Sequence, residues 1–225
     1  MTTSRRFKIS SIDTEDDLLT GVRSLKRRCP VMKRLHVLAG DPPMRRWPDG
    51  FPGLARIVVG QQLSIASAGA IWQRVSVNVD PLTPATILDL DDSALIACGL
   101  SRPKIKTLRA LAQVISSGAL DLGPLERAPD ESVRDALTQV PGIGPWTADI
   151  YLLFCLGRRD AWAPGDLALQ IATERAFSLR SRPDSERLEE IAERWRPWRG
   201  VAARLLWAYY ALPRSNPART AVRMR

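Results

Sequence analysis

Residues 137–148 read LTQVPGIGPWTA, a stretch that predicts two helices joined by a tight turn. The second helix is expected to begin near Pro145, because proline is well tolerated at a first helical position, where its missing N–H would be unpaired anyway. Gly142 and Gly144 permit positive φ and let another backbone approach closely. Ile143, between them, is expected to fill the space between the two helices. The stretch therefore predicts a helical hairpin.

The second helix of this hairpin would present free backbone N–H groups and a positive dipole end, which together favour a bound phosphate. Such a contact does not depend on base sequence. We therefore expect Gly142, Ile143, Gly144 and Thr147 to contact a nucleic-acid backbone. The alternative is a turn whose glycines serve packing alone. The pattern resembles the helix-hairpin-helix motif.

A carboxylate follows the hairpin in the stretch APGDLAL, residues 163–169. Pro164 and Gly165 predict a turn that places Asp166 at a helix N-cap, where its side chain can accept backbone N–H groups. Capping alone would explain this residue. The chemical alternative is bond cleavage at a sugar, because a carboxylate stabilises the positive charge that builds on the sugar or orients the attacking water.

Composition favours a polyanionic partner. The net charge is +9, the sequence pI is about 10.2, and 28 of the 33 basic residues are arginine, whose guanidinium suits bidentate phosphate contact. The alternative is a compositional bias on a solvated surface. The three cysteines are scattered, which argues against a zinc or iron–sulfur site and fits a reduced intracellular compartment. With His36 as the single histidine, histidine-based triads and His-rich metal sites are excluded.

The periodicity of apolar residues is helical along most of the chain, and it predicts an all-α fold. No apolar run reaches the roughly twenty residues of a spanning helix, and residues 1–10 are expected to form a basic surface tail rather than a signal peptide. The predicted helices are Asp13–Arg28, Val31–Ala39, two helices over Leu54–Val75, Ala94–Cys98, Lys104–Ser116, Asp130–Thr138, Trp146–Leu156, Leu167–Leu179, Ser185–Trp195 and Trp198–Leu212.

A proline-rich loop over Gly40–Gly53 is the expected domain boundary. It divides the chain into an N-terminal helical segment, residues 1–50, that packs on the core, and the core itself, residues 51–225.

Three blocks together carry a resemblance to a known family: IVVGQQLSIAS at residues 57–67, the stretch 140–166, and ERWRPWRGVAARLLWAY at residues 193–209. They resemble the helix-hairpin-helix–Gly/Pro-Asp superfamily of base-excision DNA glycosylases, and within it the 3-methyladenine DNA glycosylase II branch. The resemblance implies a two-lobed helical core and makes Asp166 the catalytic aspartate. The N-terminal α/β lobe of longer relatives is expected to be absent or reduced, because only about fifty residues precede Phe51.

The family pattern also implies the base pocket and the type of reaction. Bifunctional members carry a lysine where this chain has Trp146, and tryptophan cannot form a Schiff base, so we expect no strand cleavage. Trp146 and Trp207 match aromatic residues of the pocket, where an electron-rich ring attracts a cationic methylated purine. Both tryptophans can instead be plain core residues. Ile150 and Leu167 stand where one pocket pattern has tyrosine, which indicates a less aromatic pocket.

A side chain must fill the gap when a base leaves the duplex. The matching position is Gln62, with Leu63 beside it; the alternative is that the glutamines only join two helices. The resemblance implies no cofactor, apart from a monovalent cation that the backbone carbonyls of Thr138, Val140 and Ile143 can hold.

Together these features predict a cytoplasmic, monomeric glycosylase that removes alkylated purines, 3-methyladenine and 7-methylguanine, from duplex DNA. The alternatives are another lesion range, such as hypoxanthine or etheno adducts, and a DNA-binding protein that keeps the hairpin but performs no chemistry.

Overall fold

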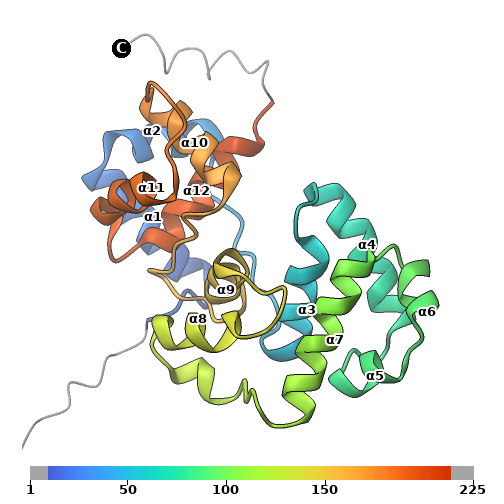
Figure 1. The fold of residues 1–225 in the computed structure, drawn as a ribbon. Helices are drawn as coiled ribbons and strands as arrows, with labels where there is room; N and C mark the ends of the chain where they lie inside the picture. Colours follow the sequence, from blue (N-terminus) through green and yellow to red (C-terminus); the bar gives the residue numbers. More distant parts are fainter. Residues whose placement is uncertain (1–9, 214–225) are drawn as a thin grey trace, which may run out of the picture. The chain divides into compact units, whose positions relative to one another are not determined.

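The computed structural model describes residues 10–213, so the predicted tail at residues 1–10 lies almost entirely outside it (Figure 1). The chain forms two compact units. The second unit spans Trp47–Leu156, and the first combines the chain up to Arg46 with the chain from Gly157 onward. The chain thus leaves the first unit close to the predicted boundary at residue 50, and it returns at a second crossing that the sequence does not signal.

The described residues form helices, with one isolated backbone bridge between Ser11 and Arg158 and no strand, so the all-α prediction is confirmed. None of the helices within residues 10–213 is long and apolar enough to cross a membrane.

The first unit contains α1 (Glu15–Arg28), α2 (Pro30–Ala39), α10 (Leu167–Phe177), α11 (Ser185–Ala192), the 3₁₀ turn η3 (Glu193–Trp195) and α12 (Arg199–Ala211). α1 begins with a capping box, in which the Thr14 hydroxyl accepts the Asp17 amide and the Asp17 carboxylate accepts the Thr14 amide. Pro30 then opens α2, one residue before the predicted start at Val31, because a first-turn N–H has no helical partner to lose.

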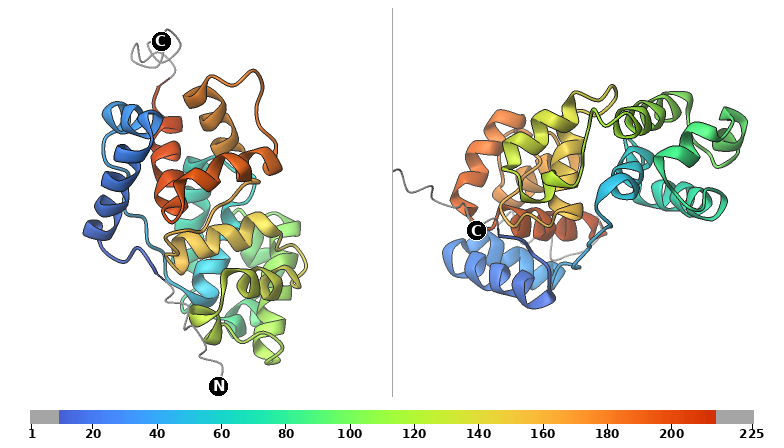
Figure 2. Two further views of the ribbon diagram at one scale, coloured as in Figure 1. Left: turned by 90° about the vertical axis from the view of Figure 1, so that its left-hand side faces the viewer. Right: turned by 90° about the horizontal axis from the view of Figure 1, so that it is seen from below.

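α12 is the central helix of the first unit, and α1, α2 and α10 pack against it (Figure 2, where the blue helices lie beside the red one). α1 approaches it most closely at Gly21, where an added Cβ would lie 2.6 Å from Val201 and 2.7 Å from the Trp198 ring. The first turn of α12 is fixed by Arg199, a buried arginine that pairs with three carboxylates, those of Asp160, Glu189 and Glu193.

The second unit is built around α3 (Gly50–Gly60), most of whose side chains are buried and which packs against three other helices. The others are α4 (Ile65–Asn78), α5 (Pro84–Asp89), α6 (Asp92–Ala97), α7 (Arg102–Ser116), the 3₁₀ turn η1 (Pro124–Arg127), α8 (Asp130–Thr138), α9 (Pro145–Ile150) and the π-helical turn η2 (Tyr151–Cys155).

Two helix predictions in this unit can be compared directly with the structure. The pair expected over Leu54–Val75 is present as α3 and α4, with Ser64 capping α4. The single helix expected over Trp146–Leu156 instead widens after Ile150 into a π-helical turn, which the apolar periodicity does not signal. Such turns are rare and often accompany functional segments.

The Arg199 ion pairs give a stability test. Replacing Arg199 with Ala removes a buried guanidinium that pairs with half-buried Asp160 and Glu189 and with exposed Glu193, so we expect the free energy of unfolding in urea to fall by about 2 kcal/mol. Arg187→Ala is the matched control, because Arg187 pairs with Glu190 at the exposed surface and its loss is expected to cost less than about 1 kcal/mol. Equal losses for the two variants would contradict the structural role of Arg199.

Candidate functional site

The predicted hairpin is present between α8 and α9. Its turn is closed by the Ile143 amide, which donates to the Val140 carbonyl at 3.0 Å. Gly144 then caps α9, accepting the amides of Thr147 and Ala148 at 3.0 and 3.2 Å. Ile143 is 4% exposed and sits in the packed interior, while Gly142 remains at the surface. The exposed backbone of this turn suits a phosphate.

Gly142 is required at its position for two independent reasons. Its φ is +88°, a region that L side chains rarely adopt. An added Cβ would also lie 2.0 Å from the Thr107 hydroxyl of α7, so the turn rests directly on that helix. Gly144 differs, because space is open around it and its φ is −98°.

Two side chains from outside the turn hold the hairpin. Gln61 Nε2, at the end of α3, donates to the Gly142 carbonyl at 3.1 Å and to the Thr147 hydroxyl at 2.9 Å. Arg134 Nε on α8 donates to the buried Asp149 carboxylate on α9 at 2.6 Å. Burial opposes the charge on Arg134, but the bond and attraction to Asp149 outweigh it, so the pKa of Arg134 is raised.

Sequence reasoning missed these hairpin supports. The GQQLS block drew attention to Gln62, whereas the bonds to the hairpin come from Gln61. The two consecutive glutamines mark the segment in the sequence, but the hairpin residue to which Gln61 donates, Gly142, lies 81 positions away.

The turn between α3 and α4 presents the two predicted gap-filling residues. Gln62 has φ +55° and is exposed, and the adjacent Leu63 is 40% exposed. A positive φ is uncommon for a residue other than glycine. Which of the two enters DNA stays a prediction.

The predicted N-cap at Asp166 is confirmed in the first unit. Its Oδ1 accepts the Leu169 amide at 2.9 Å, as a helix cap should. The same oxygen also accepts the indole N–H of Trp207 on α12 at 3.0 Å. Two donors from different helices therefore fix the orientation of this half-buried carboxylate.

The structure places the predicted pocket residues in both units. In the first unit, Trp207 is half-buried and bonds to Asp166. Leu167 follows Asp166 as the first residue of α10 and is 54% exposed. Trp146 is half-buried and Ile150 is 4% exposed in α9 of the second unit. Their contribution to one shared pocket stays a prediction.

The backbone carbonyls predicted to surround a monovalent cation belong to the end of α8 and to the hairpin turn, and their binding of an ion stays a prediction. The Val140 carbonyl accepts the Ile143 amide and retains a second lone pair, and the Thr138 hydroxyl points back to the Arg134 carbonyl at 2.8 Å. In the part of the chain that the structure describes, His, Cys, Asp and Glu side chains form no metal-binding cluster.

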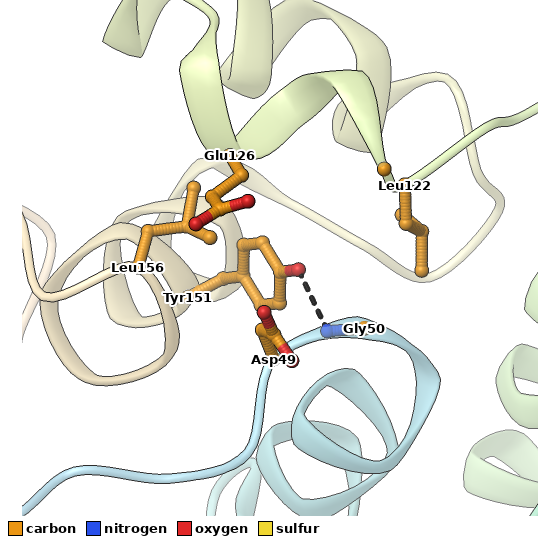
Figure 3. Close-up of a pocket in the computed structure, with 7 residues that line it drawn as sticks. Asp49, Gly50, Leu122, Glu126, Tyr151 and Leu156 are labelled. Carbon is orange, nitrogen blue, oxygen red and sulfur yellow. Dashed lines mark hydrogen bonds between the residues drawn. The ribbon is translucent and has the colours of Figure 1, made fainter.

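A small pocket in the second unit is lined by Asp49, Gly50, Leu122, Gly123, Glu126, Tyr151 and Leu156 (Figure 3). The Tyr151 phenol accepts the Gly50 amide at 3.0 Å. Burial raises the pKa of Tyr151 to about 12, so the phenol is neutral at physiological pH. Tyr151 thus holds the first turn of α3.

Known proteins are similar to this chain in sequence and in fold. The family described as HhH-GPD superfamily base excision DNA repair protein matches residues 55–197. DNA-3-methyladenine glycosylase 1 of Schizosaccharomyces pombe is 34% identical over 163 residues, which cover 71% of this chain and 72% of the relative. The alkylbase DNA glycosidase-like protein mag2 of the same yeast is 28% identical over 171 residues, covering 74% of this chain and 80% of that protein.

Solved structures agree with the described fold. The S. pombe 3-methyladenine DNA glycosylase in complex with abasic DNA superposes with a TM-score of 0.78 at 30% identity, covering 84% of this chain and 95% of that one. A DNA-3-methyladenine glycosidase of Bacillus halodurans gives 0.69 at 30% identity, covering 90% and 92% of the two chains.

The two hairpin glycines allow a matched test. Gly142→Ala meets Thr107 and forces a left-handed φ on alanine, so we expect the free energy of unfolding to fall by about 2 kcal/mol or more. Gly144→Ala meets open space, and a loss below about 1 kcal/mol is expected. Urea titration of both variants measures the difference, and Gly142→Ala combined with Thr107→Ala should recover part of the loss. A tolerated Gly142→Ala would show that the turn does not depend on this contact.

Proposed function

We propose that this chain, which belongs to the HhH-GPD superfamily of base excision DNA repair proteins, hydrolyses the N-glycosidic bond of alkylated purines in duplex DNA. The observation that carries the proposal is the Asp166 carboxylate, held by the Leu169 amide and the Trp207 indole at the start of α10. In support, two similar proteins are named as 3-methyladenine glycosylases, and one of the similar structures is a complex with abasic DNA.

Asp166 acts on the charge that develops on the sugar. When the bond between the base nitrogen and C1′ breaks, its electron pair leaves with the base and the sugar becomes positively charged. A fixed carboxylate stabilises that charge and orients a water molecule, which adds to C1′ and loses a proton. Because the carboxylate is already oriented by two donors, little reorganisation is needed as the charge forms.

A cationic base suits the proposed pocket. N3- and N7-methylated purines carry positive charge, which weakens the glycosidic bond and attracts the base to an aromatic face by about 0.5–2 kcal/mol. Trp207 supplies such a ring beside Asp166, and exposed Leu167 adds an apolar surface. By the family resemblance, Trp146 and Ile150 are further candidates for contact with the base. With aliphatic side chains in place of tyrosines, the pocket would also have room for hypoxanthine or etheno adducts.

The hairpin turn is proposed to hold the DNA backbone through Gly142, Ile143, Gly144 and Thr147, with Gln62 or Leu63 filling the space left by the extruded base. The carbonyls of Thr138, Val140 and Ile143 would hold a monovalent cation beneath the turn. Such an ion would supply positive charge near a phosphate, and the chemistry at the sugar needs no other cofactor. The chain is proposed to act as a monomer in the cytoplasm.

Release of the base from alkylated duplex DNA tests this function. We expect the protein to release 3-methyladenine and 7-methylguanine, and Asp166→Asn to lower the single-turnover rate by about 100-fold or more. Trp207→Phe keeps the ring but removes the N–H donor, so a loss of about tenfold is expected in the rate rather than in DNA affinity. If the wild-type protein releases no base from a panel that includes hypoxanthine and ethenoadenine, the chain is not a glycosylase of this type.

Strand cleavage provides an independent test of the reaction type. Because Trp146 stands where a lysine would form a Schiff base, the product should contain an intact abasic site that is cut only after alkali treatment. Borohydride trapping should yield no covalent protein–DNA complex. Alkali-independent nicking by pure protein would overturn the monofunctional assignment.

A further inference from the structure

Gln61 links two segments that both face DNA in the proposed function. Its amide nitrogen donates one hydrogen to the Gly142 carbonyl and the other to the Thr147 hydroxyl. The Gly142 carbonyl can only accept, which fixes the orientation of the amide. The partner hydroxyl belongs to a residue that is 2% exposed, so the link is partly shielded from water.

The turn that follows Gln61 depends on this link. Its own backbone bonds are long: the Gln61 amide reaches the Val58 carbonyl, and the Leu63 amide the Gly60 carbonyl, both at 3.3 Å. Gln62, between them, adopts a left-handed conformation that costs free energy for a non-glycine residue. Lys104 holds the preceding Val59 carbonyl and Ser64 caps α4, while the Gln61 side chain ties the turn to the hairpin through bonds of 2.9 and 3.1 Å.

We propose that Gln61 is a positioning residue that couples the hairpin's contact with the DNA backbone to the entry of the Gln62–Leu63 turn into the duplex. The inference rests on the proposed function and adds a role that neither segment has alone. A hairpin bound to phosphate would hold Gly142 and Thr147 in place, and through Gln61 it would hold the turn in the position needed to enter the base stack. Displacement of such a turn by about 1 Å is enough to slow catalysis strongly.

Gln61→Ala separates coupling from DNA binding. Three quantities are measured: the dissociation constant for undamaged duplex, the fluorescence of 2-aminopurine opposite a tetrahydrofuran abasic site at saturating protein, and the single-turnover release of 7-methylguanine. We expect the dissociation constant to change less than about threefold, since the hairpin remains. The fluorescence response should fall by more than about half, and base release by about tenfold.

Three further variants make the result specific. Gln61→Met keeps the length of the side chain but loses both donors without adding charge, so it should behave like Gln61→Ala. Thr147→Val removes one of the two acceptors and should give an intermediate loss of fluorescence response. Gln73→Ala, at an exposed glutamine of α4 in the same unit, is the matched control and should match the wild type. Thermal unfolding and circular dichroism establish that each variant is folded.

Two outcomes overturn the proposal. An unchanged fluorescence response in Gln61→Ala shows that the turn needs no link to the hairpin. A loss of affinity for undamaged DNA that matches the loss of response shows that Gln61 only supports the hairpin. The fluorescence response is measured on an abasic duplex and does not require release of a base. If the wild-type protein gives this response but releases no base, the proposed chemistry is rejected and the coupling can still be measured.

Discussion

The bond from the Trp207 indole to Asp166 Oδ1 connects the carboxylate to the central helix of the first unit. The same helix also holds the other end of the segment that leads to Asp166. At its first turn, the Gly200 amide donates to the Arg159 carbonyl at 2.9 Å, and buried Arg199 pairs with Asp160. The loop before α10 is therefore fixed at both ends by α12, and a carboxylate on an otherwise irregular segment gains the defined position that electrostatic stabilisation requires.

In the second unit, neighbouring residues likewise fix the position of a backbone turn, the hairpin. The hairpin has few atoms of its own to pack, so its position is set by neighbours: Thr107 lies beneath Gly142, Gln61 bonds it from α3, and Arg134 pairs with Asp149 across the two hairpin helices. The Asp149 carboxylate is costly to bury, but Arg134 pairs with it, and loss of Arg134 would leave this carboxylate in the interior without that partner. A surface that binds phosphate through backbone N–H groups needs this support, because those groups cannot be re-aimed by a rotamer change.

Sequence reasoning succeeded where the determinant is local. The hairpin, the Asp166 cap and most helix starts are set by glycine, proline or a capping side chain within a few residues, and their physical preferences hold in most contexts. It failed where the partner is distant. Trp207 was predicted as a stacking surface, and its bond to Asp166 joins residues 41 positions apart. Gln61 bonds to a residue 81 positions away, and Thr107 also contacts the hairpin from a different helix. The return of the chain to the first unit after Leu156 is likewise a tertiary property.

Capping and catalysis were rival explanations of Asp166, and the observed hydrogen bonds are compatible with both. A cap needs only the Leu169 amide, which Oδ1 accepts. The indole of Trp207 adds nothing to the backbone of α10, yet it reaches the same oxygen from a different helix and remains half-buried beside exposed Leu167. A carboxylate oriented by a second donor, beside an exposed apolar side chain, is the arrangement that the proposed reaction requires.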